Sequence, residues 1–326
     1  MEDVTRCARE RRRVEGKNSR KTMSIDALRF PKRRVRSVST DPAVAIAHKH
    51  MRRDLIEFAA NLASLAVVLG SLVKQRRLKR KPMSVKTIAV IVAMEAEAAP
   101  LIEHLGLKKQ EKSPFTGPLP AVVFSGAVGD ATVHVCTNGP ARGFGVDSVG
   151  TVPAALTAYQ ACEALKPDLL VNAGTAGGFK AKGGVVGDVY LATAFKNHDR
   201  RIQIPGFDVY GVGAADAAAC PNLRAAMGFK AGVVSTGNSL DCPDVDRDAL
   251  AANDASVKEM EAAGIAHVAA MFDTPFIAVK AITDIVDGDK PTHDEFLQNL
   301  GAAAKALQGA VPKVLEFVAG KKLAEL

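Results

Sequence analysis

The segment Pro275–Asp287 (PFIAVKAITDIVD) constrains the fold of this chain more than any other. Its residues 276–282 are apolar and rich in β-branched side chains except for Lys280, which is typical of a strand covered on both faces. Asp284 follows Thr283 where that strand ends. In open α/β sheets the ligand crevice lies at the carboxyl ends of the strands. Asp284 is therefore a candidate functional carboxylate, and an acid that caps a helix or holds a loop is the alternative.

The order of apolar runs after residue 86 predicts one α/β domain. Strands are expected at 87–94, 121–124, 132–136, 168–172, 188–195, 231–235 and 276–282. Helices are expected from Glu95 onward and at 148–165, 257–271 and 294–318. Strands that alternate with helices, with one hairpin turn at Gly129-Asp130, predict a single domain of about 240 residues whose mixed β-sheet is flanked by helices.

Charge divides the chain into two parts. Residues 1–86 contain 23 Lys and Arg against 8 Asp and Glu, a net charge of +15, whereas the remaining residues contain 20 against 27, a net charge of −7. The net charge of +8 of the whole chain therefore belongs to its N-terminal part. Because the α/β domain is mildly acidic, we expect it to have no nucleic-acid partner.

The positions of the cysteines argue against a disulfide framework and against a structural zinc site. Cys7, Cys136, Cys162, Cys220 and Cys242 are scattered, with no CxxC pair and no spacing typical of zinc ligands. A chain of this length and apolar content does not need a disulfide framework. We therefore expect a reducing compartment, no structural metal and no cofactor.

Residues 1–85 form a basic extension that contains one apolar segment, 55–73. This segment approaches the length of about 20 residues that a membrane span requires, but Glu57 and Asn61 interrupt it, and interfacial helices have similar sequences. The Arg-rich, Ser-containing run before it is similar to an organelle transit peptide, although it carries more acidic residues than such peptides do. A translation start at Met83 is a further interpretation.

Three roles for this extension therefore stay open. It is a targeting or dispensable segment, a membrane-associated segment, or a nucleic-acid-binding arm, and its lack of interleaved aromatic residues disfavours the last. We expect a cytoplasmic protein, with plastid or mitochondrion as the alternative if the extension is a transit peptide.

Three other segments carry polar side chains that suit a ligand. Asn172–Gly178 (NAGTAGG) follows a predicted strand, and its glycines would let backbone N–H groups approach a flat ligand beside the Thr175 hydroxyl; a tight turn is the alternative. Its glycines do not have the dinucleotide-binding spacing GxGxxG. Glu97 lies where a helix begins. It can act as a base on water, or it can be only a first-turn acid that the helix dipole stabilises. Glu261 lies on a predicted helix. It can accept hydrogen bonds from two ribose hydroxyls while Met260 packs on the sugar, and a solvated helix carboxylate is the alternative.

Together and in this order, these segments resemble one family. The following motifs resemble the nucleoside phosphorylase superfamily and, within it, the methylthioadenosine nucleosidases: MEAEA at 94–98, NAGTAGGF at 172–179, HDRR at 198–201, STGNSLD at 235–241, MEAAGIAHVA at 260–269 and AITD at 281–284. GVDSVGTVPA, ALKPD, DGDKPT and DEFLQNL resemble the plant-type branch. The resemblance covers about residues 86–326 and implies a three-layer sandwich with helices on both faces of the sheet.

The resemblance implies hydrolysis of the N-glycosidic bond of 5'-methylthioadenosine, which yields adenine and methylthioribose in methionine salvage. By position, Asp284 corresponds to the acid that protonates purine N7, and Glu97 to the base that activates the attacking water. Glu261 and Met260 correspond to residues that bind the ribose. Since two carboxylates play opposite roles only when their environments separate their pKa values, we expect Asp284 to have the raised pKa.

Other substrate contacts are also implied by the resemblance: Thr175, Leu240, Phe276, Ile277 and Thr283. Adenine is expected beside Leu240 and Asp241, where bacterial relatives have an aromatic side chain, and against the backbone of Phe276 and Ile277. His293 and Phe296 align near the alkylthio pocket. Whether S-adenosylhomocysteine also fits stays open at this stage.

Residues 198–212 combine charged and aromatic side chains in a long connection, which by itself is typical of a surface loop. In relatives this neighbourhood contributes to a dimer interface and reaches the partner's pocket. The resemblance therefore implies a homodimer.

Two alternatives remain within the same fold. A phosphorolytic nucleoside phosphorylase would gather arginines around phosphate, but only Arg142 is an obvious candidate, because Arg200 and Arg201 fall in the long connection. Glu97 also favours water, because a carboxylate at the nucleophile position repels phosphate. A non-catalytic storage-type relative would not need to keep Glu97, Glu261 and Asp284 together. A dehydrogenase conflicts with the glycine spacing, so we expect hydrolysis.

Overall fold

The structure is a computed structural model that describes residues 84–326, which lie within the compact unit Arg80–Leu326. The expectations for the basic extension, including its apolar segment 55–73 and a start at Met83, lie outside the described residues. Within 84–326, no helix has the length and apolarity that crossing a bilayer requires.

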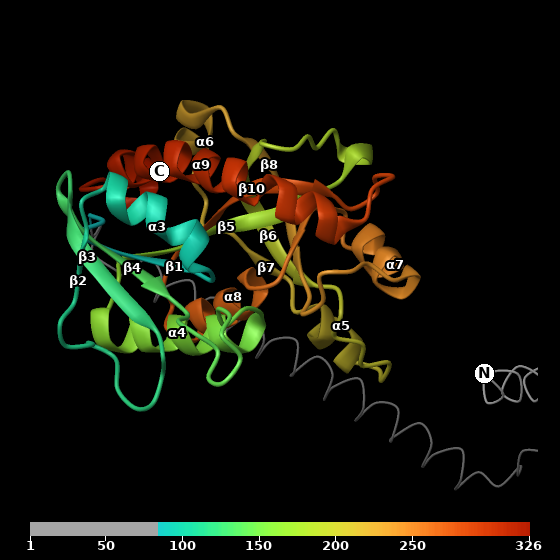
Figure 1. The fold of residues 1–326 in the computed structure, drawn as a ribbon, viewed down its shortest axis with the longest axis horizontal. Helices are drawn as coiled ribbons and strands as arrows, with labels where there is room; N and C mark the ends of the chain where they lie inside the picture. Colours follow the sequence, from blue (N-terminus) through green and yellow to red (C-terminus); the bar gives the residue numbers. More distant parts are fainter. Residues whose placement is uncertain (1–83) are drawn as a thin grey trace, which may run out of the picture. The chain divides into compact units, whose positions relative to one another are not determined.

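One ten-stranded sheet organises this part of the chain (Figure 1). Its strands are β1 (Thr87–Val92), β2 (Lys108–Lys109), β3 (Val122–Val128), β4 (Ala131–Thr137), β5 (Leu169–Gly178), β6 (Val189–Asn197), β7 (Ala215–Asp216), β8 (Lys230–Thr236), β9 (Ala255–Glu259) and β10 (Phe276–Ile285). Their order is β10-β6-β8-β9-β5-β1-β4-β3-β2, with β7 paired to β6. Because β5 also pairs with β10, strands β5, β10, β6, β8 and β9 form a closed ring, from which β1 to β4 extend.

The sheet is mixed, as predicted. Strand β1 runs parallel to both β4 and β5, and β10 runs parallel to β5. The hairpin of β3 and β4 is antiparallel, and β6 is antiparallel to β10. The carboxyl ends of β1, β5 and β10 therefore lie at the same edge of the sheet.

Helices cover both faces of the sheet. They are α3 (Glu95–His104), α4 (Thr151–Leu165), α5 (Phe207–Val212), α6 (Pro221–Met227), α7 (Asp244–Ala252), α8 (Ala262–Met271) and α9 (Thr292–Val318). Helices α3, α6 and α9 lie above the sheet in Figure 1, and α4 and α8 lie below it. The three-layer arrangement confirms the predicted fold class.

Alternating apolar residues explain these layers. In β1, Ile88 and Val90 pack into the cluster that contains Leu307 of α9, whereas Ala89 and Ile91 pack into the opposite cluster with α4 and α8. A strand with both faces buried needs apolar residues at every position, which is why β1 and β10 have nearly continuous apolar sequences.

Three local predictions were wrong. Strand β5 does not end at Asn172 but continues through the glycine-rich motif to Gly178, and all of its residues are buried. The predicted helix 257–271 begins only at Ala262, because residues 255–259 form β9 and pair with β8. The connection 198–212 is not wholly loop, since α5 begins at Phe207.

Candidate functional site

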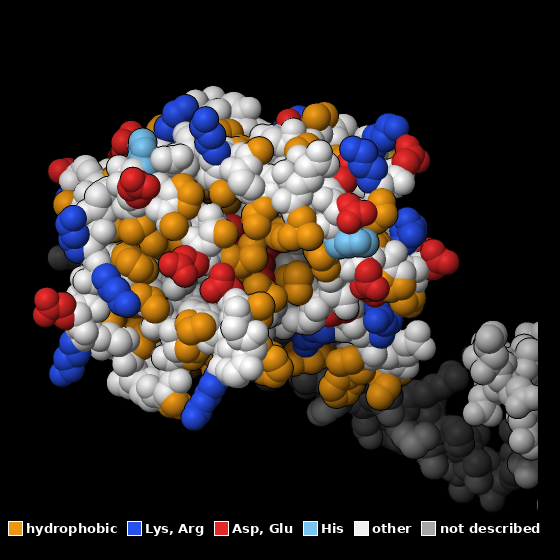
Figure 2. Space-filling view, in the orientation of Figure 1, with side chains coloured by type: hydrophobic (Ala, Val, Ile, Leu, Met, Phe, Trp, Pro, Cys, Tyr) orange, Lys and Arg blue, Asp and Glu red, His pale blue; other side chains and the backbone are white. Residues whose placement is uncertain are grey.

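A cavity of about 250 Å³ lies at the carboxyl ends of β1, β5, β9 and β10. Its lining combines polar and apolar side chains, and Figure 2 shows hydrophobic side chains across the middle of this face with acidic side chains among them. The polar lining consists of Glu97, Thr175, Lys258, Glu259, Glu261, Thr283, Asp284 and Thr292. The wall includes Met94, Val149, Leu240, Met260, Val286 and Phe296. A concave, mainly apolar site with a few convergent polar groups is typical of small-molecule binding.

Glu97 lies in the first turn of α3, directly after β1, and its side chain is buried. Its Oε1 accepts hydrogen bonds from both the backbone N–H and the hydroxyl of Thr175, each at 2.7 Å. The other oxygen accepts from the backbone N–H of Met94 at 3.3 Å. All three partners donate, which suits a carboxylate that acts as an acceptor.

Asp284 comes from the end of β10, where the pairing with β5 contains a β-bulge. The register shifts between Ile282 and Asp284, which makes Thr283 the extra residue. In a regular strand, neighbouring side chains point to opposite faces. Here the Thr283 hydroxyl instead donates to Asp284 Oδ1 at 2.6 Å. The bulge therefore turns two consecutive polar side chains toward the same site.

Burial raises the pKa of Asp284 above its ordinary value. The hydrogen bond from Thr283 and the positive charge of Lys258 oppose this increase in the pKa, whereas Glu295 adds slightly to it. The direction of the net change in pKa agrees with the expectation for Asp284. A buried carboxyl group with one hydroxyl donor favours the protonated form more than a solvated one does.

Two glycines of β5 make room for these charged groups. A Cβ atom at Gly177 would lie 2.7 Å from Asp284 Oδ2 and 2.6 Å from Val286 Cγ2. A Cβ atom at Gly174 would lie 3.4 Å from both Glu97 Oε1 and Lys280 Nζ. The NAGTAGG motif is thus a strand with space beside it, rather than a turn that presents its backbone.

Glu261 occupies the N-cap position of α8 and not the helix interior that the sequence predicted. Its Oε1 accepts from the backbone N–H of Gly150 at 3.0 Å, at the start of α4. Burial, and then the negative charge of Glu259, raise the pKa of Glu261 to about 7. This carboxyl group therefore titrates near neutral pH.

An ion pair that includes the cavity-lining Glu259 was not predicted from the sequence. Lys280 Nζ lies 2.8 Å from Glu259 Oε2, and both side chains are 1% exposed. Glu259 also accepts from the Thr236 hydroxyl. Burial alone would raise the pKa of Glu259, but the positive charge of Lys280 holds that pKa below its ordinary value. For Lys280, burial alone would lower the pKa, but the negative charge of Glu259 outweighs this effect and the pKa is raised. The lysine in an otherwise apolar strand was the available signal, because a buried lysine needs a partner.

Lys258, in the cavity wall, was also missed. Its ammonium group donates to the carbonyl oxygens of Ser239 at 2.6 Å and Leu240 at 3.0 Å. Nothing in the pattern of β9 distinguishes this lysine from a solvated one at a strand end.

The predicted contact residues fall into two groups. Thr175, Leu240, Met260, Glu261 and Thr283 line the cavity together with Glu97 and Asp284, and Phe296 lines it on the side of α9. Phe276 and Ile277 do not, because they begin β10, eight and seven residues before Asp284, or about 25 Å at the usual rise of a strand. Asp241 and His293 are outside the lining as well, and His293 is exposed. The adenine contacts expected from Phe276, Ile277 and Asp241 therefore stay predictions that the lining of this cavity does not support.

No arginine lines the cavity in the described part of the chain. Arg142 is exposed. Arg200 lies over the Tyr210 ring at 4.8 Å, and Arg201 pairs with the buried Asp246. Residues 84–326 also contain no cluster of side chains that could hold a metal ion.

The sequence profile of the Phosphorylase superfamily matches residues 87–316. The chain is 46% identical over 242 residues to 5'-methylthioadenosine nucleosidase from Arabidopsis thaliana, an alignment that covers 74% of this chain and 91% of that protein. It is 44% identical over 250 residues to 5'-methylthioadenosine/S-adenosylhomocysteine nucleosidase from the same plant, covering 77% of this chain and 98% of the relative.

The fold agrees with these relatives. The apo structure of Arabidopsis thaliana 5'-methylthioadenosine nucleosidase superposes with a TM-score of 0.74 at 45% identity, covering 75% of this chain and all of that chain. A bacterial 5'-methylthioadenosine/S-adenosylhomocysteine nucleosidase, from Shewanella pealeana, is 28% identical over 230 residues, or 66% of this chain and 93% of its own length.

Proposed function

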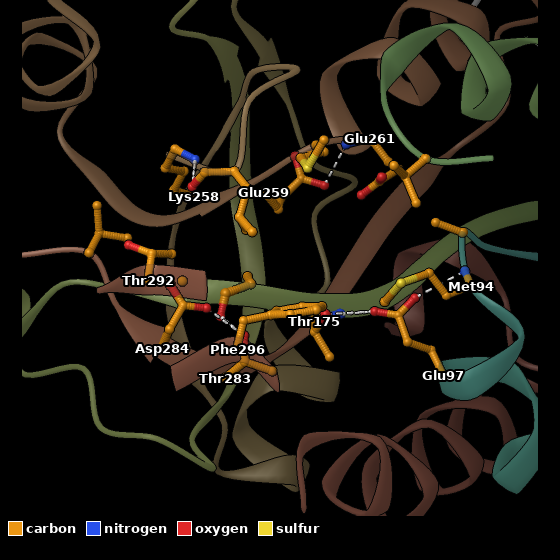
Figure 3. Close-up of a pocket in the computed structure, with 17 residues that line it drawn as sticks. Met94, Glu97, Thr175, Lys258, Glu259, Glu261, Thr283, Asp284, Thr292 and Phe296 are labelled. Atoms are coloured by element: carbon orange, nitrogen blue, oxygen red, sulfur yellow. Dashed lines mark hydrogen bonds between the residues drawn. The ribbon is translucent and has the colours of Figure 1, made fainter. Parts of the chain in front are cut away.

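Because the chain belongs to the phosphorylase superfamily, in the branch of the plant methylthioadenosine nucleosidases, we propose that it hydrolyses the N-glycosidic bond of 5'-methylthioadenosine. The observation that carries this proposal is the pair of buried carboxyl groups on opposite sides of one cavity, Asp284 and Glu97 (Figure 3). Glycoside cleavage through an oxocarbenium-like transition state requires an acid at the leaving group and a base at the water.

Asp284 is the general acid. Burial raises its pKa, which favours the protonated form, and it donates this proton to N7 of the purine as the bond from the sugar to N9 breaks. The base then leaves as neutral adenine rather than as an anion. Leu240 in the nearby wall offers an apolar contact for the flat ring.

Glu97 is the general base. It accepts a proton from the water that attacks the anomeric carbon, so that adenine and methylthioribose are the only products. The bonds from Thr175 and Met94 fix the carboxylate and leave lone pairs for the water. Glu261, with Met260 beside it, accepts from the ribose hydroxyls in its ionised form.

Hydrolysis is favoured over phosphorolysis by the charges of the site. A phosphate nucleophile needs compensating cations, but the lining contains no arginine among the described residues. Lys258 lies on the side of Asp284, opposite Glu97 where the nucleophile is accepted, and Lys280 is paired with Glu259. The carboxylate of Glu97 would repel phosphate at the position where water is accepted.

The substrate range is proposed from the relatives. One Arabidopsis relative is named for 5'-methylthioadenosine alone and the other for S-adenosylhomocysteine as well. We propose 5'-methylthioadenosine as the primary substrate, with Thr292 and Phe296 beside its alkylthio group. S-adenosylhomocysteine is the second candidate, because it shares the adenosine part that the acids recognise.

We also propose a homodimer. Several large apolar side chains are exposed on and before α4 and on α5: Phe144, Val152, Leu156, Phe207 and Tyr210. Figure 2 shows hydrophobic side chains gathered at the lower edge near α5. Gathered apolar side chains of this size are typical of an interface between subunits. Light scattering should give twice the chain mass; Phe207→Glu should reduce it to one chain, whereas Val185→Glu, at an exposed apolar residue elsewhere, should not.

The function is tested by measuring adenine release from 5'-methylthioadenosine by the full chain, with and without phosphate. We expect adenine and free methylthioribose at the same rate in both conditions. Release only with phosphate would identify a phosphorylase, and no release from a folded protein would favour a non-catalytic role. S-adenosylhomocysteine in the same assay decides whether it is a second substrate.

A further inference from the structure

Lys258 is a buried cation in the cavity wall that the proposed mechanism does not use. It belongs to the end of β9, and its side chain is 5% exposed. The next residue, Glu259, pairs with Lys280. Lys258 instead lies on the same side of the cavity as Asp284, opposite Glu97 (Figure 3). A lysine is rarely buried to this degree without a specific interaction.

The ammonium group has a fixed position. Two of its three donors are directed at the carbonyl oxygens of Ser239 and Leu240, and these bonds hold the part of the wall that includes Leu240. Carbonyl oxygens carry only partial charge, so these bonds hold the lysine without neutralising it. The full charge therefore acts on the acidic groups around it.

These surroundings are mainly acidic. The titratable groups that interact with Lys258 come from the connection after β8, from α7, from the end of β10 and from the connection after β6: Asp241, Cys242, Asp246, Asp284 and His198. Burial lowers the pKa of Lys258, and Cys242, Asp284, Asp241 and Asp246 oppose that decrease in the pKa. Asp246 is already paired with Arg201. Asp284 has no cationic partner of that kind in the hydrogen bonds and ion pairs of the described residues.

We propose that Lys258 is a positioning residue for the hydrolysis proposed above, whose charge makes Asp284 a stronger proton donor and whose hydrogen bonds hold the wall at Ser239 and Leu240. The inference rests on the proposed function, since it assigns Lys258 a role through the acid of that reaction.

The charge is useful because Asp284 is subject to opposing effects. Burial raises its pKa, which keeps the proton on the enzyme, but an acid that holds its proton too strongly transfers it poorly to the leaving purine. The positive charge of Lys258 lowers the pKa of Asp284. It therefore limits how far burial weakens the acid, without forming a salt bridge that would keep the carboxyl group ionised.

Two substitutions separate the charge from the hydrogen bonds. Lys258→Gln removes the charge but keeps N–H donors for the carbonyl oxygens, whereas Lys258→Met removes both. Without the charge, Asp284 should keep its proton to higher pH. The alkaline limb of kcat/KM, which reports the free enzyme's acid, should therefore move upward by at least about 0.5 pH unit in both variants. Only Lys258→Met should also raise KM, by about 3- to 10-fold, because it frees the wall segment.

The control is Lys196→Met. Lys196 also donates to a backbone carbonyl, that of Asn253, but it does not line the cavity. This variant should leave both the alkaline limb and KM unchanged. An alkaline limb that stays in place or moves to lower pH in folded Lys258→Gln overturns the inference, because a purely structural lysine would change KM or stability without moving the limb.

The wild-type protein distinguishes this failure from failure of the proposed function. If the wild type releases no adenine, the proposed function is wrong. If the wild type is active and loses activity at high pH, but Lys258→Gln has the same limb, only the role of Lys258 is wrong. Thermal unfolding of each variant confirms that the compared proteins are folded.

Discussion

Glu97 and Asp284 are two buried carboxyl groups in one cavity, but their surroundings differ. Glu97 accepts from two backbone N–H groups and one hydroxyl, so that both of its oxygens are hydrogen-bonded. Asp284 accepts from the Thr283 hydroxyl on one oxygen, and burial dominates its environment and raises its pKa. The two groups differ in the number of hydrogen-bond donors around them and not in burial, since Glu97 is 4% exposed and Asp284 is 2% exposed.

The proposed mechanism requires one site to hold an acid and a base at the same pH. Hydrogen bonds to a carboxylate favour its ionised form, whereas burial without enough donors favours its protonated form. The strands provide both conditions: Thr175 of β5 is directed at Glu97, and the bulge in β10 leaves Asp284 with its own neighbour as donor. The following predictions test whether this contrast controls the reaction.

The largest effect is expected for Asp284→Asn. It removes the acid but keeps the shape of the side chain, so kcat should fall by about 10³-fold or more while substrate still binds. Turnover and equilibrium binding measured on the same preparation check this. The control Asp287→Asn changes an exposed acid that accepts from backbone N–H groups of residues 180 and 181, and it should keep near-normal turnover. Near-normal turnover in Asp284→Asn would show that this residue is not the acid.

Glu97→Gln should have the next largest effect, a decrease in kcat of about 10²- to 10³-fold with substrate binding retained. The amide cannot accept the proton of the attacking water. Single-turnover adenine release and substrate binding separate these two effects. Glu103→Gln, on the exposed side of the same helix, is the control. A loss of binding as large as the loss of turnover would indicate a structural role for Glu97.

A smaller effect is expected when the space beside Asp284 is filled. Gly177→Ala places a methyl group within 2.7 Å of Asp284 Oδ2, so the carboxyl group must shift, and kcat/KM should fall by about 10- to 100-fold. Gly309→Ala is the matched control, because Gly309 is an exposed position of α9 at which a Cβ meets nothing within 4 Å. It should stabilise the protein by about 1 kcal/mol without changing activity. Equal activity in the two variants would refute the spatial role of Gly177.

The pH dependence of substrate binding should change in Glu261→Gln. Because the pKa of Glu261 is about 7, the wild-type carboxylate becomes fully available to the ribose hydroxyls only as the pH rises above neutrality. KM should therefore decrease with rising pH in the wild type, and by up to about 10-fold per pH unit below that pKa. Glu261→Gln should have a higher and nearly pH-independent KM. A parallel pH profile in both proteins would assign the titration to another group.

The smallest effect concerns stability. Glu261 has a higher pKa in the folded protein, about 7, than its ordinary value of 4.5, so the folded state binds more protons between these two values. Its contribution to the free energy of unfolding is therefore present below about pH 4.5 and lost as the pH rises through about 7. Urea unfolding of the wild type and Glu261→Gln at several pH values should give a smaller slope for the variant. Identical slopes would contradict the raised pKa.

The sequence predicts the frame of the site well. Apolar runs identify β1 and β10 as strands buried on both faces, and the amphipathic pattern places the last helix within two residues of its observed start. Asp284 lies near the end of the β10 run, and Glu97 lies in the first turn of the helix that follows β1, which makes both acids candidates from the sequence. The carboxyl ends of parallel strands meet at one edge, which brings together residues far apart in the sequence.

The sequence does not predict features that depend on pairing between strands. The glycines at 174 and 177 are typical of a turn, but they lie inside β5, where charged side chains of other elements come close. A Cβ atom would lie 2.7 Å from Asp284 Oδ2 at Gly177 and 3.4 Å from Glu97 Oε1 at Gly174. The pairing of Lys280 with Glu259 joins two separate strands, so neither residue indicates the other. The expected contact at Phe276 is not supported for a related reason, since the start of β10 lies at the opposite end from the site.

The bulge at Thr283 also bears on how this chain can change during evolution. One extra residue sets which face of β10 carries Asp284, so the deletion of a single residue between Phe276 and Ile282, with the bulge kept, would turn that carboxyl group away from the site. Substitutions of wall residues such as Leu240 or Phe296 do not change which face of β10 carries Asp284, so they can change substrate preference gradually. Divergent descendants should therefore vary in wall residues and loop lengths while the length of β10 stays constant.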